Sequence, residues 1–558
     1  MRLCTSIVVA GLTSLPLAVG SPGSPLGDYS LDPSHYGSDC LVDVDVAVIG
    51  GGSVGTYAAI QLKDQGKKVM VIEKKGRLGG HTETYTDPES GHPIDMGVKL
   101  YYDDPIVYDW YARFNLSTAT IDVSVTGGAA PQYVDFRTGQ ILKGVPAGND
   151  TELAATIQRY TAVLSKYPHL EAGFFLPDPV PEELLMPFGQ FVEKYNIGAA
   201  VQSFFNVAGA FGDILELPTI QQFRAQSLAL LATSSKFQTS SVMNNSLLFG
   251  KATDELLAAE SLLLASNVLL TERVRKSGSI KILVDTPGGR KLVVAEKLLI
   301  TIPPTPAALA SFDINEEELS IFSQLQGFGY YTSIIRNAGP ANFTLQNLAV
   351  DQPYALPPRP GFYNCNPTGV NTALSLCFYG TKLGQIFSDN EAKAAMVADL
   401  KRYQTANGLN ATEPEFVAFS NHSPYWLMVG AEATKAGFYQ KMYALQGKRN
   451  TFWTEKPPVV KSAERKFLWK VEFTVLALLW LLYLVCLVER INIGNAKIQG
   501  MEVEVSLKGQ KYIVAVFIFN AGHVVAGVPL SIAFKKDVLD EGAVEDLGEK
   551  HPDFRNSL

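Results

Sequence analysis

The sequence predicts an α/β protein built around a Rossmann-like (GxGxxG) nucleotide-binding domain, and three adjoining features predict it. The run VDVAVI at 44–49 is apolar and β-branched, which is typical of a buried parallel strand. A G-x-G-x-x-G turn follows at once, and a helix is expected over 57–65. A second strand, KVMVIE at 68–73, completes a strand–helix–strand unit that ends on an acidic residue.

Each glycine of the turn has its own expected part in binding a dinucleotide. Gly50 permits the tight turn, Gly52 lets the backbone approach a pyrophosphate, and Gly55 lets the helix pack closely on the strand. The free N–H groups and the positive dipole at the start of the helix favour phosphate. Glu73 is expected to accept hydrogen bonds from ribose hydroxyls, and its charge disfavours NADP because it would repel a 2′-phosphate.

The residues after this unit indicate which dinucleotide it binds. The stretch KKGRLGGHTETY at 74–85 resembles the flavin-containing amine oxidase superfamily, in which a second glycine pair follows the strand–helix–strand unit. The longer stretch GGHTETYTDPESGHPIDMGV at 79–98 is similar to a fungal secreted subgroup of FAD oxidoreductases related to β-cyclopiazonate dehydrogenase. The resemblance covers residues 42–454 and implies FAD as cofactor.

The resemblance and the glycine motif together assign a set of cofactor contacts. His81 belongs to it although many relatives carry arginine at that position. The expected cofactor-binding residues are Gly50, Gly52, Ser53, Gly55, Glu73, Arg77, Gly79, Gly80, His81 and Val274.

Val274 enters the set through a third segment. Residues 267–304 alternate apolar and polar side chains around a Pro-Gly-Gly turn, which predicts a β-meander. In the superfamily, a valine early in this segment contacts the adenine through its backbone. The resemblance further implies an α+β substrate domain interleaved with the FAD-binding domain. The expected boundaries are 42–110, 245–310 and 435–454 for the FAD-binding domain, 111–244 and 311–434 for the substrate domain, and 455–558 for a tail.

Catalysis in such a protein asks little of the side chains, because the flavin carries the electron chemistry and the protein positions a substrate C–H bond over flavin N5. Aromatic walls would orient a flat or amine substrate, although aromatic residues at similar spacing also fill ordinary cores. The substrate candidates are His422, Tyr425, Trp426, Phe438 and Tyr439. The sequence carries no H-E-x-x-H and no CxxC motif, so no metal site is expected.

The N-terminus predicts entry into the secretory pathway. Arg2 precedes a short apolar run at 7–19, and small residues at 18–20 offer a cleavage site, so residues 1–20 are typical of a signal peptide. A membrane anchor is the alternative, but the run is short for a span. N-x-S/T triplets that could accept glycans begin at Asn115, Asn149, Asn244, Asn342, Asn410 and Asn421.

Composition bears on partners and on redox state. The net charge of −8 over 558 residues gives no basic field to attract nucleic acid, so no nucleic-acid partner is expected. The partner that the resemblance implies is a small-molecule substrate. Cys365 and Cys377 bracket a short loop. They would form a disulfide in an oxidising compartment, or else remain two buried thiols.

After Thr454 the sequence changes character. In the subgroup, a Gly-Ala-rich turn and a helix close over the flavin, but here EKPPVVKSAERKFLWK at 455–470 stands in their place. Two apolar runs follow, with candidate membrane helices at 471–489 and 512–534 and a buried helical hairpin as the alternative. Residues 478–502 resemble the first helix and loop of fungal major-facilitator anion:cation symporters.

These observations predict an FAD-dependent oxidoreductase of amine-oxidase type. It would take a hydride from a substrate carbon next to nitrogen and pass the electrons to O2 or another acceptor. The flavin domain would lie in the secretory pathway or outside the cell. The alternative is a membrane-tethered chain, associated with the membrane through residues 471–534, or a fused transporter fragment whose flavin domain is impaired.

Overall fold

The computed structural model describes residues 29–122, 129–145, 148–171, 173–208, 212–233, 236–273, 278–339, 342–409 and 412–454. Apart from 173–175, these residues belong to one compact unit. The predicted signal peptide, Val274, Asn410, and the tail with both candidate membrane helices lie outside the described residues. No described helix combines the length and apolar character needed to cross a bilayer.

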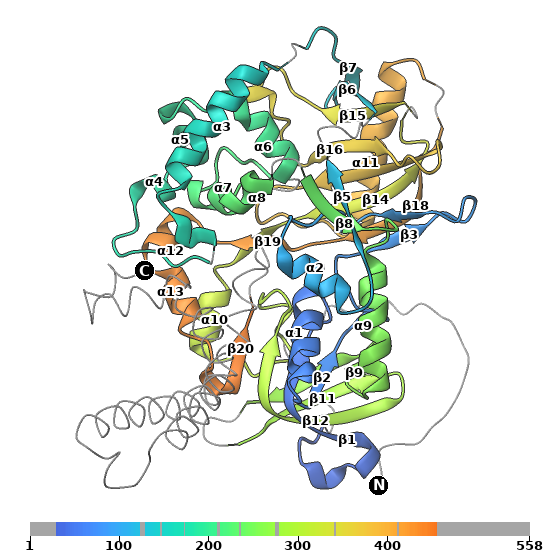
Figure 1. Cartoon of the computed structure of the whole chain (residues 1–558), viewed down its shortest axis with the longest axis vertical. Coiled ribbons are helices and arrows are strands. Elements are labelled where there is room, and N and C mark those ends of the chain that lie inside the picture. The colour runs from blue at the N-terminus through green and yellow to red at the C-terminus, as the bar shows by residue number, and fades with distance from the viewer. Residues whose placement is uncertain are drawn as a thin grey trace, which may run out of the picture. The chain divides into compact units, whose positions relative to one another are not determined.

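The first sheet contains the predicted strand–helix–strand unit (Figure 1). β1 (Leu41–Ile49) lies between β2 (Val69–Ile72) and β12 (Gly289–Ile300), and all three run parallel. Their carboxyl ends meet where Ile49 pairs with Ile72 on one side and with Ile300 on the other. Each of these ends is apolar and buried, as a parallel sheet covered on both faces requires.

Three further features complete the first sheet. β9 (Leu262–Leu263) extends it beyond β2, and the predicted meander is confirmed as β10 (Asn267–Glu272), β11 (Ile280–Thr286) and β12. β20 (Thr451–Trp453) then pairs with the end of β12 in parallel. The last described segment of the chain is therefore a strand of the same sheet that carries the glycine turn.

Among the described residues, the second sheet also has seven strands and is mostly antiparallel. Its strand order is β18-β14-β17-β16-β15-β6-β7, and only β15 and β6 run parallel. The bounds are β6 Ala130–Asp135, β7 Gln140–Ile141, β14 Tyr330–Arg336, β15 Phe343–Asn347, β16 Gly361–Pro367, β17 Leu374–Gly380 and β18 Glu415–Asn421.

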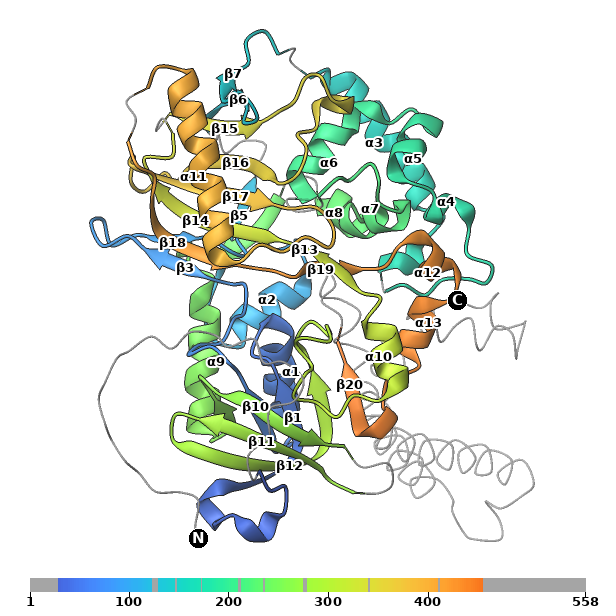
Figure 2. The same ribbon diagram turned by 180° about the vertical axis from the view of Figure 1, so that it is seen from behind.

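One face of the second sheet is covered by α11 (Asp389–Ala406), as Figure 2 shows. The helix begins with a capping box in which Ser388 and Glu391 exchange hydrogen bonds with each other's backbone N–H groups. Its inward residues, among them Met396 and Leu400, are fully buried against Tyr331 and other residues of the sheet. This leaves Tyr330, the strand neighbour of Tyr331, on the opposite face.

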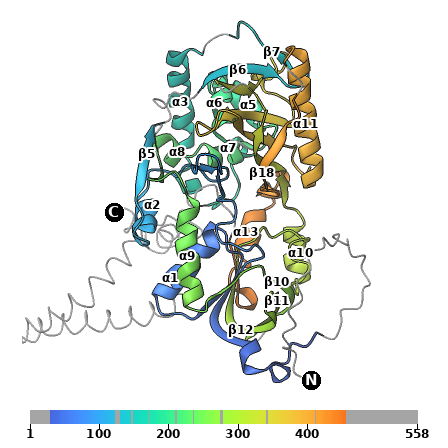
Figure 3. The same cartoon turned by 90° about the vertical axis from the view of Figure 1, so that its right-hand side faces the viewer.

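The first sheet has its own helical cover. Figure 3 shows α1 (Ser53–Asp64) and α9 (Ser246–Ala258) together on one side of that sheet. They are joined by an ion pair between Lys63 and Glu255, at 3.0 Å. α1 starts four residues before the expected 57–65 because Gly52 serves as the N-cap and Ser53 already has helical geometry.

The remaining elements connect the sheets or form a helical layer over residues 150–233. They are α2 Pro105–Ala112, α3 Asp150–Leu164, α4 Glu182–Leu185, α5 Phe188–Lys194, α6 Val201–Ala208, α7 Thr219–Ala225, α8 Leu228–Thr233, α10 Glu316–Phe322, α12 Ala431–Lys435 and α13 Phe438–Tyr443, with strands β3 Thr84–Thr86, β4 Pro93–Asp95, β5 Thr118–Asp122, β8 Lys236–Ser240, β13 Gln326–Phe328 and β19 Tyr425–Met428.

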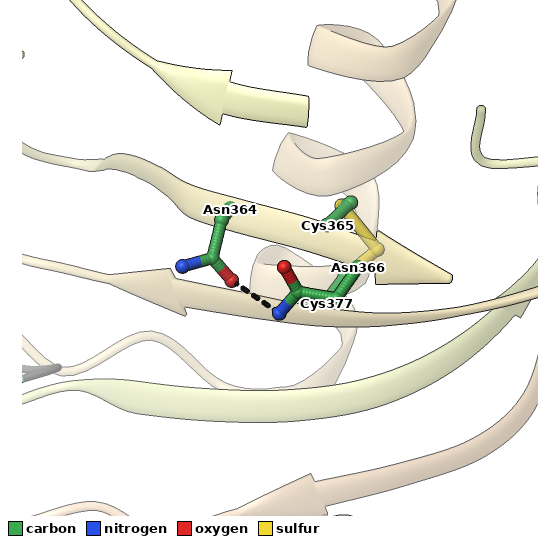
Figure 4. Close-up of a disulfide and its surroundings, with 4 residues drawn as sticks. All are labelled: Asn364, Cys365, Asn366 and Cys377. Carbon is green, nitrogen blue, oxygen red and sulfur yellow. Dashed lines mark hydrogen bonds between the residues drawn. A yellow bond between two sulfur atoms is a disulfide. The ribbon is translucent and has the colours of Figure 1, made fainter. Parts of the chain in front are cut away.

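Cys365 and Cys377 form a disulfide (Figure 4). They lie directly opposite each other on β16 and β17, with their Cα atoms 4.0 Å apart. Next to the bond, the Asn366 side chain donates to Asn364 Oδ1 at 2.8 Å. Of the two states open to the sequence, the structure contains the bonded one.

A buried ion network ties the end of β10 to α10. The Arg273 guanidinium is fully buried and donates to both carboxylate oxygens of Glu318 at 2.9 Å. Its Nε also donates to Asp313 at 2.7 Å, and Arg449 binds the same two acids. Every charge in the network therefore has a partner of opposite sign, which is what makes such deep burial tolerable.

Candidate active site

The first glycine turn needs glycine for reasons that the structure makes concrete. Gly50 has a φ of +101°, and a Cβ on it would lie 2.7 Å from Thr301 Oγ1. A Cβ on Gly55 would overlap the carbonyl oxygen of Gly50. Around Gly52, by contrast, the nearest atom to an added Cβ is the Cα of Gly80, at 4.0 Å. The turn is thus tight on its inner side and bare on its outer side.

The second glycine pair packs against this bare side. Gly79 donates its N–H to the Gly51 carbonyl at 2.8 Å. Gly80 has a φ of +56°, and a Cβ on it would come within 2.9 Å of the Gly52 Cα. Two stretches of backbone without side chains therefore meet at the start of α1.

The N-terminus of α1 is open toward the same place. No side chain caps it, and the N–H groups of its first turn, beginning with Ser53, have no partner within the helix. Free amides, a positive helix dipole and bare glycine backbone are the features that accept a phosphate group.

Glu73 is buried at the end of β2. One carboxylate oxygen accepts the N–H of Gly51 at 2.6 Å, and the other accepts the N–H of Lys75 at 2.7 Å. Each oxygen keeps a lone pair, so the carboxylate can accept ribose hydroxyls as the sequence predicts. Its backbone contacts add a role that the motif alone does not reveal, because they link the first glycine turn to the following loop.

Arg77 shapes the second glycine turn. It donates to the carbonyls of Leu78 and Gly80 at 3.1 Å and pairs with Glu83. Burial raises the pKa of Glu83, but hydrogen bonds from Lys75 and Ser420 and the charge of Arg77 outweigh it, so the pKa is lowered overall. A contact between Arg77 and a phosphate stays a prediction.

His81 follows this turn directly and contacts the second sheet. Its ring stacks on that of His422, with centroids 4.3 Å apart and planes inclined by 22°. His422 is buried, and its backbone N–H donates to the backbone carbonyl of Tyr330 at 2.9 Å. The structure therefore joins a predicted cofactor residue to a predicted substrate residue.

Tyr330, Tyr363 and Tyr425, which we call the tyrosine cluster, lie beyond His422. The ring of Tyr330 is 4.9 Å from that of Tyr425 and 6.3 Å from that of Tyr363. Burial raises the pKa of Tyr425 to about 12 and raises those of the other two. All three hydroxyls are protonated at neutral pH and can act as hydrogen-bond donors.

The other substrate candidates occupy a different environment. Phe438 and Tyr439 are 2% and 1% exposed, and their rings pack on each other at 5.2 Å. Gln221 bridges Tyr439 and the indole N–H of Trp426, both at 3.1 Å. These three aromatic residues are core residues in this structure, and only His422 and Tyr425 among the candidates lie with the tyrosine cluster.

Two members of the cluster escaped the sequence analysis. Tyr330 and Tyr363 lie in β14 and β16, whereas the substrate residues predicted from the sequence all lie within 422–439. The alternation of side chains along a strand could have indicated Tyr330, because Tyr330 and Tyr331 must lie on opposite faces of the sheet and both cannot fill the same core.

Comparison with known proteins identifies the family of this chain and, with it, the cofactor. Residues 48–114 match the family model described as an NAD(P)-binding Rossmann-like domain. The FAD-dependent oxidoreductase oblC of Cochliobolus heterostrophus is 38% identical over 81% of this chain and 94% of its own length. The chain belongs to this family of fungal FAD-dependent oxidoreductases. Beta-cyclopiazonate dehydrogenase of Aspergillus oryzae is 32% identical to this chain, over 74% of this chain and 88% of its own length.

Solved structures share the fold of this FAD-dependent oxidoreductase. A fatty acid isomerase from P. acnes superposes with a TM-score of 0.56 at 16% identity, over 74% of this chain and 93% of that one. Putrescine oxidase bound to putrescine gives a TM-score of 0.53 at 14% identity, over 76% and 97%. The chain therefore shares its fold with these two enzymes.

The described residues fit FAD. The bare face formed by Gly52 and Gly80 would admit the pyrophosphate, and the first turn of α1 would supply amides to it. Glu73 would hold the ribose. Of the predicted contacts, Val274 lies outside the described residues, and Arg77 and His81 stand beside the second glycine turn.

Proposed function

We propose that this FAD-dependent oxidoreductase removes a hydride from a substrate carbon next to nitrogen, beside the stacked rings of His81 and His422. The stack carries the proposal, because it connects the loop that follows the second glycine turn to the aromatic face of the second sheet. A substrate held on that face would lie next to the cofactor loop. The resemblance to amine oxidases at 74–85 supports the choice of a carbon next to nitrogen.

When bound, FAD supplies the two-electron acceptor. The protein's part is to bind and orient. Tyr330 and Tyr425 remain protonated at neutral pH, so they can donate hydrogen bonds to a substrate but cannot take a proton from it. Phe378 lies parallel to Tyr330, with the two ring centroids 6.4 Å apart. O2 or another oxidant would then restore the cofactor.

Anaerobic mixing tests the reaction class. Full-length purified protein is mixed with amines and with alcohols of matched carbon skeleton, and flavin absorbance is followed. Bleaching by amines that have a hydrogen on the neighbouring carbon, with colour restored by O2, is the expected result. Bleaching by the matched alcohols alone would contradict the proposal, while leaving the flavin assignment intact.

We further propose that the flavin domain is secreted and glycosylated. The disulfide between Cys365 and Cys377 supports an oxidising compartment. Asn115 and Asn342 are exposed and so are open to a glycan. Treatment with an N-glycosidase should increase the mobility of the secreted protein on a gel. Unchanged mobility together with a retained Met1 would count against secretion.

We propose that residues 455–558 are a fused segment that the oxidoreductase fold does not require. The alignments cover 93–94% of the lengths of two relatives, but only 80–81% of this chain. The difference favours an added segment, and the symporter-like run at 478–502 suggests its origin. The second candidate, a membrane-tethered oxidoreductase, would be favoured if the full-length protein sedimented with membranes and remained fully active.

A further inference from the structure

Arg359 is a buried cation whose hydrogen-bonding capacity is only half used. The residue is 3% exposed and lies two positions before the start of β16. Its Nη1 donates to the carbonyls of Gly361 and Phe362, at 2.9 and 3.1 Å. Its Nε and Nη2 are buried and have no hydrogen-bond partner. These two N–H groups form one edge of the guanidinium, which is the edge that binds a carboxylate through two parallel hydrogen bonds.

Two aromatic rings pack against this guanidinium. Its Cζ lies 3.4 Å from the ring centroid of Tyr363 and 4.7 Å from that of Phe205. The rings fix the plane of the guanidinium and hold its free edge in one direction. None of the ion pairs found among the described residues includes Arg359, although Asp213 acts on it electrostatically from a greater distance. Leaving such a charge buried without an anion is costly.

The Arg359 guanidinium adjoins the candidate active site through Tyr363. Tyr363, which stacks on Arg359, belongs to the tyrosine cluster, and Tyr330 connects it to His422, whose ring centroid is 5.8 Å away. Rings thus follow one another without interruption from His81 at the cofactor loop to Arg359. Tyr330 and Tyr425 are only partly buried, so a ligand can reach their surfaces.

We propose that Arg359 binds an ionised acidic group of the substrate, a carboxylate or an enolate, through its Nε–H and Nη2–H groups. The tyrosine cluster would bind the flat body of the same molecule and donate hydrogen bonds to its oxygen atoms. The substrate class is then a planar organic anion. This inference rests on the proposed function, since it assigns the substrate of the same site.

A structural role is the competing explanation. Arg359 would then serve only to hold the backbone at Gly361 and Phe362 and to stack on Tyr363. The two roles differ in one measurable respect. A purely structural arginine gives no preference for a charged ligand over a neutral ligand of the same shape.

Calorimetric titration with benzoate and with benzamide separates the two roles. The two molecules share a planar ring and size but differ in charge. Full-length protein should bind benzoate about tenfold or more tightly than benzamide, the gain expected of a charge-assisted pair of hydrogen bonds. In Arg359→Gln this preference should vanish, and in Arg359→Lys it should be reduced because lysine lacks the two-pronged edge.

Arg336→Gln is the matched control. Arg336 lies on β14 of the same sheet and makes exposed ion pairs with Glu89 and Glu415, so its loss should leave the preference unchanged. Equal affinity of the native protein for the two probes would overturn the inference, and this comparison stands even if Arg359→Gln does not fold. A preference that persists in folded Arg359→Gln would overturn it as well.

Failure of the inference and failure of the proposed function have different signatures. Flavin content and anaerobic bleaching by amines report on the proposed function alone. Protein that is yellow and bleached by amines, yet shows no charge preference, retains the proposed function and loses the anion site. Protein that lacks flavin but still prefers benzoate retains the anion site and loses the proposed function.

Discussion

Gly80 lies so close to Gly52 that a Cβ on Gly80 would be only 2.9 Å from the Gly52 Cα. The two glycines come from different turns, and a side chain on Gly80 would prevent the turns from approaching so closely. This proximity makes a backbone surface at the start of α1, which is where the family's cofactor needs room.

Gly52→Val should leave the fold intact but abolish flavin retention. An added Cβ at Gly52 meets no protein atom closer than 4.0 Å, whereas it projects into the space assigned to the pyrophosphate. The measurement is the flavin-to-protein ratio together with circular dichroism. Gly76→Val is the control, since the surroundings of Gly76 are open and it lies outside both turns. Full flavin stoichiometry in folded Gly52→Val would refute the assignment.

Asp95 should make stability depend on pH. Burial raises its pKa from 3.8 to about 6, although hydrogen bonds from Thr84 and Asn245 oppose the rise. The unfolded chain therefore ionises first as pH rises, so the free energy of unfolding should fall between about pH 4 and pH 6, by about 3 kcal/mol for such a shift. Urea unfolding at several pH values measures this.

The Asp95→Asn variant should flatten that dependence, since asparagine does not ionise. Asp43→Asn, at an exposed position of β1, should retain the native profile. An unchanged profile in Asp95→Asn would assign the pH dependence to another group.

Arg273→Met should destabilise the protein by about 3–5 kcal/mol, because it leaves the buried carboxylate of Glu318 without its bidentate partner. The exposed pair of Lys448 and Glu317 offers a comparison on the same helix, and Lys448→Ala should cost about 1 kcal/mol or less. Denaturant titration measures both. Equal effects would mean that burial does not decide the value of these ion pairs.

Replacing Cys365 and Cys377 by alanine should lower stability by about 3 kcal/mol, the value typical of a disulfide that closes a loop of this size. Unfolding of the native protein with and without a reducing agent provides the comparison. If the double variant is as stable as the oxidised native protein, the bond adds nothing to the strands that already pair around it.

Replacing residues 455–558 by the Gly-Ala-rich turn and helix of the subgroup should raise flavin occupancy and solubility. Pro457 and Pro458 lack N–H groups that the usual turn would offer, and Glu455 adds a negative charge. Flavin absorbance per mole of protein and turnover are compared for the two chains. If the native chain already binds flavin stoichiometrically and reacts as fast as the graft, the tail is a working part of the enzyme.

Local sequence predicted the strand–helix–strand unit, because glycine spacing and strand apolarity are set within thirty or so residues. The meander was predicted for the same reason, whereas the sequence left open whether Cys365 and Cys377 form a disulfide or remain two thiols. The tyrosine cluster was not, since Tyr330, Tyr363 and Tyr425 come together only through the pairing of separate strands. Nor could aromatic character alone distinguish Tyr425, which lies in the cluster, from Tyr439, which lies in the core.

The position of β20 in the first sheet has a consequence for biosynthesis. Leu41 in β1 pairs with Leu292 in β12, so this pairing cannot form until β12 has been synthesised. The pairing of β12 with Thr451–Trp453 can form only later still. The nucleotide-binding unit emerges first and is completed last, so its carboxyl edge stays open while the second sheet is made. Pairings between strands that are far apart in the sequence slow folding. The complete cofactor site can therefore form only after nearly the whole enzyme has left the exit tunnel.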